Sequence, residues 1–159
     1  MGDSLFSNSD ENSIYFSRAD VSQDLGSFSD HPFLLEHKEW PSVEHYFQAM
    51  KFEDESYQEQ IRLADSPKSA RKLGRKRSKA LRADWKSVKS VFMTRAFYTK
   101  CRAYPAIAEK LLATGDRWLV ENSQYDYYWG CGRDHRGENM YGQMLMKVRD
   151  RLREERQNS

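Results

Sequence analysis

Hydrophobic residues recur at steps of three and four through most of this chain, and that spacing predicts helices. We expect six helices, at about 42–53, 56–64, 66–74, 84–101, 105–113 and from 139 to about 152. Short apolar runs predict strands at 14–17, 33–40 and 118–121. The pattern therefore indicates the α+β class, as a mostly helical single domain with a small β-sheet.

Three of the expected helices begin at residues that are typical of helix starts. Ser42 follows Pro41 and Ser66 precedes Pro67, so each serine can accept a hydrogen bond from a free N–H of the first turn. Asn139 stands at the corresponding place before the last helix and is expected to cap it.

The two ends of the chain are expected to be tails. Residues 1–12 are rich in Ser, Asn and Asp and lack the apolar segment of a signal peptide, so we expect a flexible tail there. One domain is expected at 13–155, with a short tail at 156–159. No segment approaches the ~20 apolar residues of a membrane span. Two well-separated cysteines, Cys101 and Cys131, fit a reducing compartment, so we expect a cytoplasmic protein.

The helix expected at 42–53 places a carboxylate near its N-terminus, where partial positive charge favours the ionised form. Its hydrophobic residues share one face and are Val43, Tyr46, Phe47 and Met50. Glu44, Gln48 and Lys51 share a second face. A helix that is apolar on more than one side is expected to be wrapped by protein, so this polar stripe would line a cleft. The other interpretation is a solvated face.

The loop expected at 121–137 surrounds one acid with aromatic residues and glycines. Its central run is Tyr125-Asp126-Tyr127-Tyr128-Trp129-Gly130-Cys131-Gly132. Aromatic neighbours raise the pKa of a carboxyl group by desolvation unless it is hydrogen-bonded, and a raised pKa suits proton transfer. Glycines allow the backbone to approach a ligand closely. The other interpretation is that the aromatic residues form core and Asp126 is a turn residue.

Positive charge is concentrated in one stretch of the chain. Charged residues make up 31% of the 159 residues, and a net charge of +2 argues neither for nor against nucleic acid. Between Lys68 and Arg82, however, eight of the fifteen residues are cationic. Either this run is a solvated face, or one or two of its arginines bind a substrate phosphate. The histidines and cysteines show no ligand-like spacing apart from Cys131-x-x-x-His135, so we expect no metal and no cofactor.

Several motifs follow one another along the chain. They are Trp40-Pro41-Ser42-x-Glu44-His45-Tyr46-Phe47-Gln48-Ala49-x-Lys51-Phe52, Ser66-Pro67 with Ala70-Arg71 and Gly74-Arg75, Leu81-Arg82-x-Asp84-Trp85, Asp126-x-Tyr128-Trp129-Gly130-x-Gly132, and Gly137-x-Asn139-x-x-Gly142 with Leu145-Met146. Together they resemble the NADAR superfamily, in particular its YbiA-like N-glycosidases linked to riboflavin biosynthesis. The likeness spans roughly Tyr15 to Leu152. It departs from the family in the early loop, where Phe-Ser-Asn-Phe is common and this chain has Phe28-Ser29-Asp30-His31.

The resemblance implies hydrolysis of a C–N glycosidic bond to a phosphoribosyl or ADP-ribosyl unit. In the YbiA-like branch the substrates are phosphoribosylamino-pyrimidines, the first intermediates after the GTP cyclohydrolase step of riboflavin synthesis. Cleavage gives ribose 5-phosphate and a pyrimidine. Other branches act on ADP-ribose, including ADP-ribosylated guanine.

These implications lead to a hypothesis for the site. Cleavage would pass through an oxocarbenium-like state at ribose C1, with Glu44 stabilising the charge or guiding water and Asp126 protonating the leaving group or activating water. Lys51 is an alternative nucleophile, through a Schiff base with the ring-opened sugar. We expect the two carboxylates to converge across one aromatic-walled pocket. The expected substrate-binding residues are Trp85 and Trp129 for the pyrimidine, Arg71, Arg75 and Arg18 for the phosphate, and Tyr46, Gln48 and Asn139.

Two other functions stay open at this point. An ADP-ribosyl glycohydrolase acting on ADP-ribosylated guanine is the alternative enzyme. A non-catalytic module that binds ADP-ribose or single-stranded nucleic acid is the alternative outside enzymes. For the N-glycosidase we expect a small phosphoribosyl substrate as partner, with no membrane and no stable nucleic-acid partner, and the sequence leaves the oligomeric state open.

Overall fold

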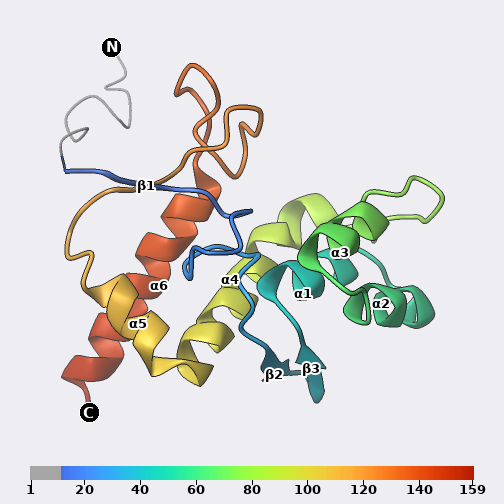
Figure 1. The fold of residues 1–159 in the computed structure, drawn as a ribbon, viewed down its shortest axis with the longest axis horizontal. Helices are drawn as coiled ribbons and strands as arrows, with labels where there is room; N and C mark the ends of the chain where they lie inside the picture. The colour runs from blue at the N-terminus through green and yellow to red at the C-terminus, as the bar shows by residue number, and fades with distance from the viewer. Residues whose placement is uncertain (1–11) are drawn as a thin grey trace. The chain divides into compact units, whose positions relative to one another are not determined.

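The computed structural model describes residues 12–159 and shows mostly helix with short strands (Figure 1). The helices are α1 (Val43–Ala49), α2 (Glu55–Arg62), α3 (Pro67–Gly74), α4 (Trp85–Ala103), α5 (Pro105–Leu112) and α6 (Met140–Gln157). The strands are β1 (Ile14–Phe16), β2 (Phe33–Leu35), β3 (Lys38–Trp40) and β4 (Leu119–Glu121). The α+β class and all six expected helices are confirmed.

The described chain divides into two compact units. We call Ala19–Pro105 the central unit, and Ala106–Ser159 together with the described residues up to Arg18 the terminal unit. The predicted flexible tail at 1–12 lies almost wholly outside the described residues. At the other end, α6 continues to Gln157, two residues into the predicted C-terminal tail. The predicted domain boundaries stay a prediction.

The central unit is built around α1, whose seven residues are all buried. The helix packs against α2, α3 and α4, so it is enclosed by protein, as its apolar residues on more than one side predict. The polar residues of this helix are therefore held away from bulk water. This enclosure gives the side chain of Glu44 its surroundings.

The local signals at two helix starts in this unit are confirmed. The Ser42 hydroxyl accepts a bond from the His45 amide at 3.2 Å, and the Ser66 hydroxyl accepts one from the Ser69 amide at 3.0 Å. The first helix ends earlier than predicted. The Phe52 amide bonds the Ala49 carbonyl at 3.2 Å, and such i→i−3 contacts tighten and close a last turn.

The strand predicted at 33–40 is wrong, because this segment is a hairpin. Strands β2 and β3 pair antiparallel, with Phe33 opposite Trp40. Glu36 and His37 form the two-residue connection and have φ values of +56° and +67°. Positive φ at both central positions is the geometry of a type I′ turn, which usually contains Asn and Gly. The pair Glu-His does not indicate such a turn, so the apolar pattern predicted one continuous strand.

In the terminal unit, β1 and β4 form a parallel pair, with Ile14 opposite Leu119 and Phe16 opposite Glu121. Helix α6 packs on β4. The core of this layer includes the fully buried residues Leu119, Val120, Tyr141 and Leu145. The expected small sheet is thus two separate two-stranded sheets within the described residues.

Asn139 does not cap α6 in the predicted way. It stands at the N-cap position in the left-handed region, at φ +52°, and its side chain makes no capping hydrogen bond. Its amide instead bonds the backbone of β4, through the Leu119 carbonyl at 2.9 Å and the Glu121 amide at 2.8 Å. The side chain therefore joins the strand to the start of the helix.

None of the helices between residues 12 and 159 has the length and apolar character needed to cross a membrane.

Candidate functional site

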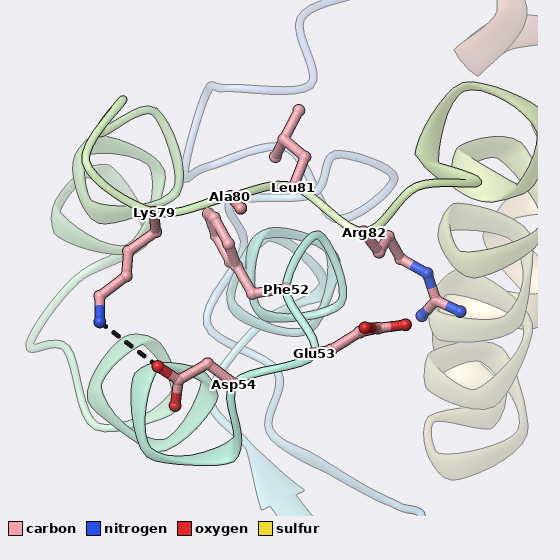
Figure 2. A pocket seen from close by; sticks show the side chains of 7 residues that line it. All are labelled: Phe52, Glu53, Asp54, Lys79, Ala80, Leu81 and Arg82. Carbon is pink, nitrogen blue, oxygen red and sulfur yellow. Dashed lines mark hydrogen bonds and ion pairs between the residues drawn. The ribbon is translucent and has the colours of Figure 1, made fainter.

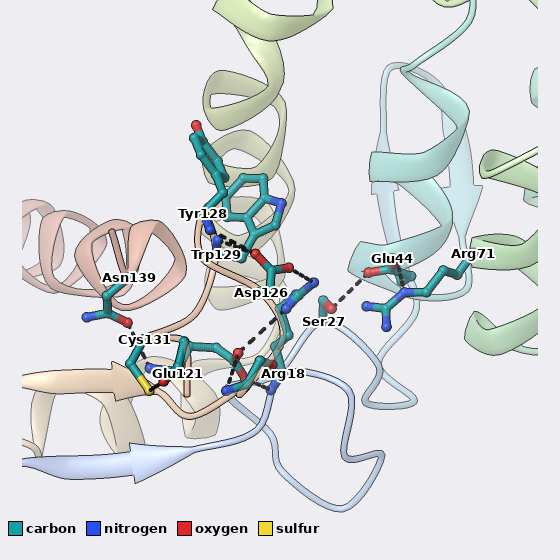
Figure 3. A network of polar contacts seen from close by, with 12 residues as sticks. Arg18, Ser27, Glu44, Arg71, Glu121, Asp126, Tyr128, Trp129, Cys131 and Asn139 are labelled. Carbon is teal, nitrogen blue, oxygen red and sulfur yellow. Dashed lines mark hydrogen bonds and ion pairs between the residues drawn. The ribbon is translucent and has the colours of Figure 1, made fainter. Parts of the chain in front are cut away.

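The carboxylate of Glu44 is held by side chains from three places in the central unit. It is 1% exposed and accepts hydrogen bonds from Ser27 Oγ at 3.0 Å and Arg71 Nε at 2.9 Å (Figure 3). A third bond comes from Gln48 Nε2 at 2.7 Å. Ser27 comes from the loop before β2, Gln48 from the next turn of α1, and Arg71 from α3. Three donors, one of them charged, stabilise a buried negative charge and fix its direction.

The loop that supplies Ser27 also contacts the backbone and the arginine of this cluster. The Glu44 amide donates to the Ser27 carbonyl at 3.0 Å. The Arg71 guanidinium lies 4.4 Å from the centre of the Phe28 ring, within the range of a cation–π contact. Ser27 and Phe28 thus define where the acid and its basic partner lie.

Lys51 lies two residues beyond the end of α1, and its amine is partly withdrawn from water. Burial lowers its pKa to about 8, although the negative charge of Glu44 acts to raise it. The positive charges of Arg75, Arg71 and Lys89 lower it further. Its Nζ lies 3.4 Å from the Gly74 carbonyl oxygen. A lysine with this pKa has a substantial neutral fraction near neutral pH.

Gln48 fits its place only because residue 74 has no side chain. A Cβ at Gly74 would lie 2.0 Å from Gln48 Oε1, far inside van der Waals contact. That oxygen is buried and has no hydrogen-bond partner among the described residues, while the amide nitrogen is taken by Glu44. The end of α3 therefore fixes the Gln48 amide, which in turn holds Glu44.

The aromatic residues predicted in this unit form a packed cluster. Trp85 is 8% exposed, with ring centres 5.1 Å from Phe47 and 6.1 Å from Phe92. Tyr46 is fully buried, its hydroxyl donates to Glu36 at 2.9 Å, and burial raises its pKa. Both residues contribute to the core, and their predicted substrate contacts stay predictions.

Asp126 belongs to a second polar cluster, in the terminal unit (Figure 3). Its Oδ1 accepts the amides of Tyr128 at 3.0 Å and Trp129 at 2.8 Å, and its Oδ2 accepts Arg18 Nη2 at 2.9 Å. Trp129 is 7% exposed and packs edge-to-face with Tyr128. This is the geometry of a turn acid that orders its own loop.

These contacts determine the charge of Asp126. Burial acts to raise its pKa, but the Arg18 charge and the bonds from Trp129 and Tyr128 outweigh burial, so the pKa lies below the ordinary value. The sequence predicted a raised pKa only for a carboxyl without hydrogen bonds, and the three bonds to Asp126 meet that exception. An acid with a lowered pKa is ionised at neutral pH and is a weak base.

Arg18 is more enclosed than its predicted role in phosphate binding suggests. The residue is 6% exposed, and its guanidinium lies between Asp126 and Glu121, with a distance of 3.6 Å from Nη1 to the Glu121 carboxylate. Glu121 is fully buried and also accepts the Arg18 amide at 2.8 Å. Two carboxylates thus already balance this cation.

Sequence analysis missed three buried polar residues: Ser27 and Glu121, which belong to these clusters, and Lys100, which binds the loop that carries Ser27. Glu121 ends the apolar strand β4, and Lys100 falls seven residues after Met93 on the buried side of α4. A charged residue in an otherwise buried stripe is a visible signal in both places. Ser27 stands in a Ser/Asp/Gly loop and carries no comparable signal.

A cavity of about 310 Å³ lies in the central unit, lined by Phe52, Glu53, Asp54, Lys79, Ala80, Leu81 and Arg82 (Figure 2). None of these residues belongs to the predicted catalytic or binding set. Across the cavity Lys79 and Asp54 form an ion pair at 3.3 Å, with side chains 43% and 45% exposed. Such an exposed pair has little of the desolvation that makes charges effective in catalysis.

Some of the predicted site residues thus form two clusters, one in each unit. Glu44, Gln48, Lys51 and Arg71 form one cluster in the central unit, with Arg75 exposed at the end of α3. Arg18 and Asp126 form another in the terminal unit. That the two acids face one sugar stays a prediction. Within residues 12–159, no group of three or more His, Cys, Asp or Glu side chains is placed to hold a metal ion.

Comparison with known proteins extends these observations. A family model described as the NADAR domain matches residues 5–153. The N-glycosidase YbiA of Escherichia coli K12 is 42% identical over 138 residues, covering 87% of this chain and 86% of that protein. The NMR structure of E. coli YbiA matches with a TM-score of 0.84 and 41% identity, over 92% of this chain and 88% of that one. The chloroplastic riboflavin biosynthesis protein PYRR of Zea mays is 35% identical over 153 residues, covering 87% of this chain but 25% of that protein.

Proposed function

This chain belongs to the NADAR domain family and is a hydrolase of N-glycosidic bonds, and from that premise we propose a substrate for it. The substrate is a phosphoribosylamino-pyrimidine intermediate of riboflavin synthesis, and the sugar product is ribose 5-phosphate. A relative named for riboflavin biosynthesis supports the pathway. The observation that carries the proposal is a buried carboxylate, Glu44, beside a lysine of lowered pKa and a surplus of cations.

Glu44 supplies a fixed negative charge. Its three donors hold the carboxylate in place before substrate arrives, so no reorganisation is needed when positive charge develops at ribose C1. Withdrawal from water strengthens this electrostatic stabilisation. The same carboxylate is suited to orient a water molecule toward C1.

Cations around Lys51 suit the phosphate of this substrate. Arg71, Arg75 and Lys89 all lie close enough to Lys51 to lower its pKa, whereas Glu44 is the acid that acts on it. The phosphate of a phosphorylated sugar would supply the negative charge needed to balance these cations. An arginine binds a phosphate with charge-assisted and often bidentate hydrogen bonds. Arg71 and Arg75 are therefore better placed for this role than Arg18.

Lys51 provides a covalent route beside direct attack by water. In the ring-opened sugar, C1 forms an imine with the pyrimidine amine. Neutral Lys51 adds to C1, the pyrimidine amine leaves after taking a proton, and a lysine Schiff base remains. Water then hydrolyses the lysine Schiff base, which gives the aldehyde form of ribose 5-phosphate and free Lys51. The lowered pKa of Lys51 supports this route, since only the neutral amine is a nucleophile.

Asp126 takes a positioning role in this proposal. Its oxygens are occupied by Arg18 and by two amides of its own loop, and its pKa is lowered. Proton transfer is better served by a group whose pKa lies near the working pH. Asp126 therefore orders the loop that carries Trp129.

The test is incubation of the protein with a phosphoribosylamino-pyrimidine and measurement of free ribose 5-phosphate. We expect turnover by the wild type and strongly reduced turnover by Glu44→Gln. Parallel incubation with ADP-ribosylated guanine identifies the alternative enzyme, whose product is free ADP-ribose. Faster turnover of the guanine conjugate would replace the proposed substrate, and no release from either would leave a binding module.

A further inference from the structure

Lys100 of α4 is a buried lysine whose ammonium is fully engaged by one loop. The residue is 1% exposed. Its Nζ donates to the Asp24 carbonyl at 2.6 Å, the Gly26 carbonyl at 2.9 Å and the Ser29 hydroxyl at 2.6 Å. An ammonium has three N–H donors, and each has a partner here. We call residues 24–29 the anchored loop.

The anchored loop holds Glu44 between its two fixed ends. Ser27 lies between Gly26 and Ser29, and both of these residues bind Lys100. Ser27 then contacts Glu44 twice, because its carbonyl accepts the Glu44 amide and its hydroxyl donates to the Glu44 carboxylate, each at 3.0 Å. The next residue, Phe28, lies against Arg71, which also binds the Glu44 carboxylate.

We propose that Lys100 is a positioning residue for Glu44: its ammonium fixes the anchored loop, and the loop fixes the acid. The link to catalysis rests on the function proposed above. The link to the position of Glu44 rests on the contacts alone.

A purely packing role does not account for a lysine at this place. A buried charge is costly unless it is paired or fully hydrogen-bonded, and an apolar residue of similar length would fill the same space without that cost. Burial lowers the pKa of Lys100 to about 8, against the opposing effects of Cys101 and Asp24. The Phe97 ring lies 5.5 Å away, and His31 Nδ1 lies 3.0 Å from the Ser29 hydroxyl. The three loop oxygens that accept hydrogen bonds from Nζ therefore explain why a lysine stands at this place.

The direct test follows the Glu44 amide proton by hydrogen exchange in Lys100→Met. Lys86→Met is the matched control, because Lys86 lies on the same helix and is exposed. We expect exchange at the Glu44 amide to be about tenfold faster in Lys100→Met, since its acceptor is the Ser27 carbonyl, and unchanged in Lys86→Met. Amides in the middle of α4 should keep their protection. Unchanged protection of Glu44 in a folded Lys100→Met would overturn the inference.

A second measurement separates positioning from general stability. With the pyrimidine substrate, kcat of Lys100→Met should fall by about 10- to 100-fold with little change in KM, because the acid is displaced rather than removed. In a Ser27→Ala background the same change should have a much smaller effect on kcat, whereas the loss in Tm should be similar in both backgrounds. Equal effects on kcat in both backgrounds would show that Lys100 does not act through Ser27.

Ser29→Ala replaces Lys100→Met in the exchange experiment if Lys100→Met does not fold. It removes one of the three acceptors and leaves the ammonium bound to two carbonyls. We expect a smaller increase in Glu44 exchange, in the same direction, and no increase would count against the inference. The exchange result does not depend on substrate. A wild type without activity on the pyrimidine would refute the proposed function and leave the positioning of Glu44 intact.

Discussion

Glu44 and Asp126 are both acids paired with an arginine, but they are held in different ways. The Glu44 carboxylate is bound by three side chains, and two of them come from segments distant in sequence. Asp126 is bound largely by the backbone of its own loop, and its side chain is 27% exposed against 2% for Glu44. The contacts of Glu44 hold a negative charge away from solvent, whereas those of Asp126 define the conformation of a turn.

The charge balance around the two acids differs as well. Near Lys51 three cations act together, with Glu44 as the opposing charge. Around Arg18, by contrast, two carboxylates share one guanidinium. A surplus of positive charge can accept an anionic substrate, whereas a balanced or negative cluster gains nothing from one. This contrast supports our proposal that phosphate binding and catalysis belong to the central unit.

Glu44→Gln should have the largest effect on activity. Glutamine keeps the size of the side chain but removes the negative charge that we propose stabilises positive charge at C1, so kcat should fall by about 10²–10³-fold. Steady-state assay of ribose 5-phosphate gives kcat and KM, and circular dichroism checks the fold. A variant that turns over at nearly the wild-type rate would remove Glu44 from the mechanism.

Lys51→Arg tests the covalent route with the positive charge retained. At pH 7 an amine with a pKa of about 8 is about 10% neutral, roughly 200 times more than an ordinary lysine. Arginine has no neutral form in this range, so kcat should fall by about a hundredfold and borohydride should no longer trap a covalent adduct.

The pH profile of the wild type checks the same route. Because the pKa of Lys51 is lowered, the neutral amine accumulates as pH rises through about 8, and kcat/KM should rise over that range. Lys86→Met should keep this profile. A profile that is flat through pH 8, with no adduct, would favour direct attack by water.

Gly74→Ala should disturb the Glu44 cluster through Gln48. The new Cβ would lie 2.0 Å from Gln48 Oε1, so the amide must move and its bond to Glu44 weakens. Overpacking of this kind destabilises by about 1–3 kcal/mol, which thermal unfolding measures, and we expect a loss in kcat of about tenfold.

Gly115→Ala is the comparison for this change. Gly115 has φ +65°, and a Cβ added there would meet open space, so alanine should lower Tm through backbone strain and leave kcat unchanged. Equal losses of kcat in the two variants would mean that stability, and not Gln48, explains the effect of Gly74→Ala.

The parts of this structure that could be predicted from sequence depend on neighbouring residues. Ser42 and Ser66 cap their helices because the bond spans three residues, and Glu44, Gln48 and Lys51 share a stripe because a helix repeats. The turn at Glu36 and His37 was not predicted, because these residue types do not indicate the positive φ values that they adopt.

Contacts between distant segments could not be predicted in the same way. Lys100 binds carbonyls more than seventy residues earlier in the chain, and Arg18 meets Asp126 across 108 residues. Such pairs depend on the packed fold, and no local pattern specifies them. The lowered pKa of Asp126 depends in part on such a contact, because the distant Arg18 acts together with the local amides of Trp129 and Tyr128.

Among the substitutions in the two acid clusters, Asp126→Asn should have the smallest effect on activity. Asparagine keeps an oxygen for the Tyr128 and Trp129 amides and loses only the ion pair with Arg18, which still has Glu121. We expect kcat to fall by less than about tenfold, below the 10²–10⁴-fold effect of losing a general acid or base. A loss of a hundredfold or more in a well-folded variant would restore Asp126 as a proton-transfer group.

Stability against pH sharpens the same comparison. Because the folded pKa of Asp126 is lowered, its contribution to stability is complete above the unfolded pKa of about 3.9 and is lost as pH falls through the folded value. The wild type should therefore lose more stability than Asp126→Asn as pH falls below about 4, while the difference between them stays constant from pH 6 to 8. Denaturant unfolding at each pH measures this difference. If the two proteins lose stability in parallel in acid, the Arg18–Asp126 pair does not stabilise the loop, and the contrast between the two acids would have to rest on Glu44 alone.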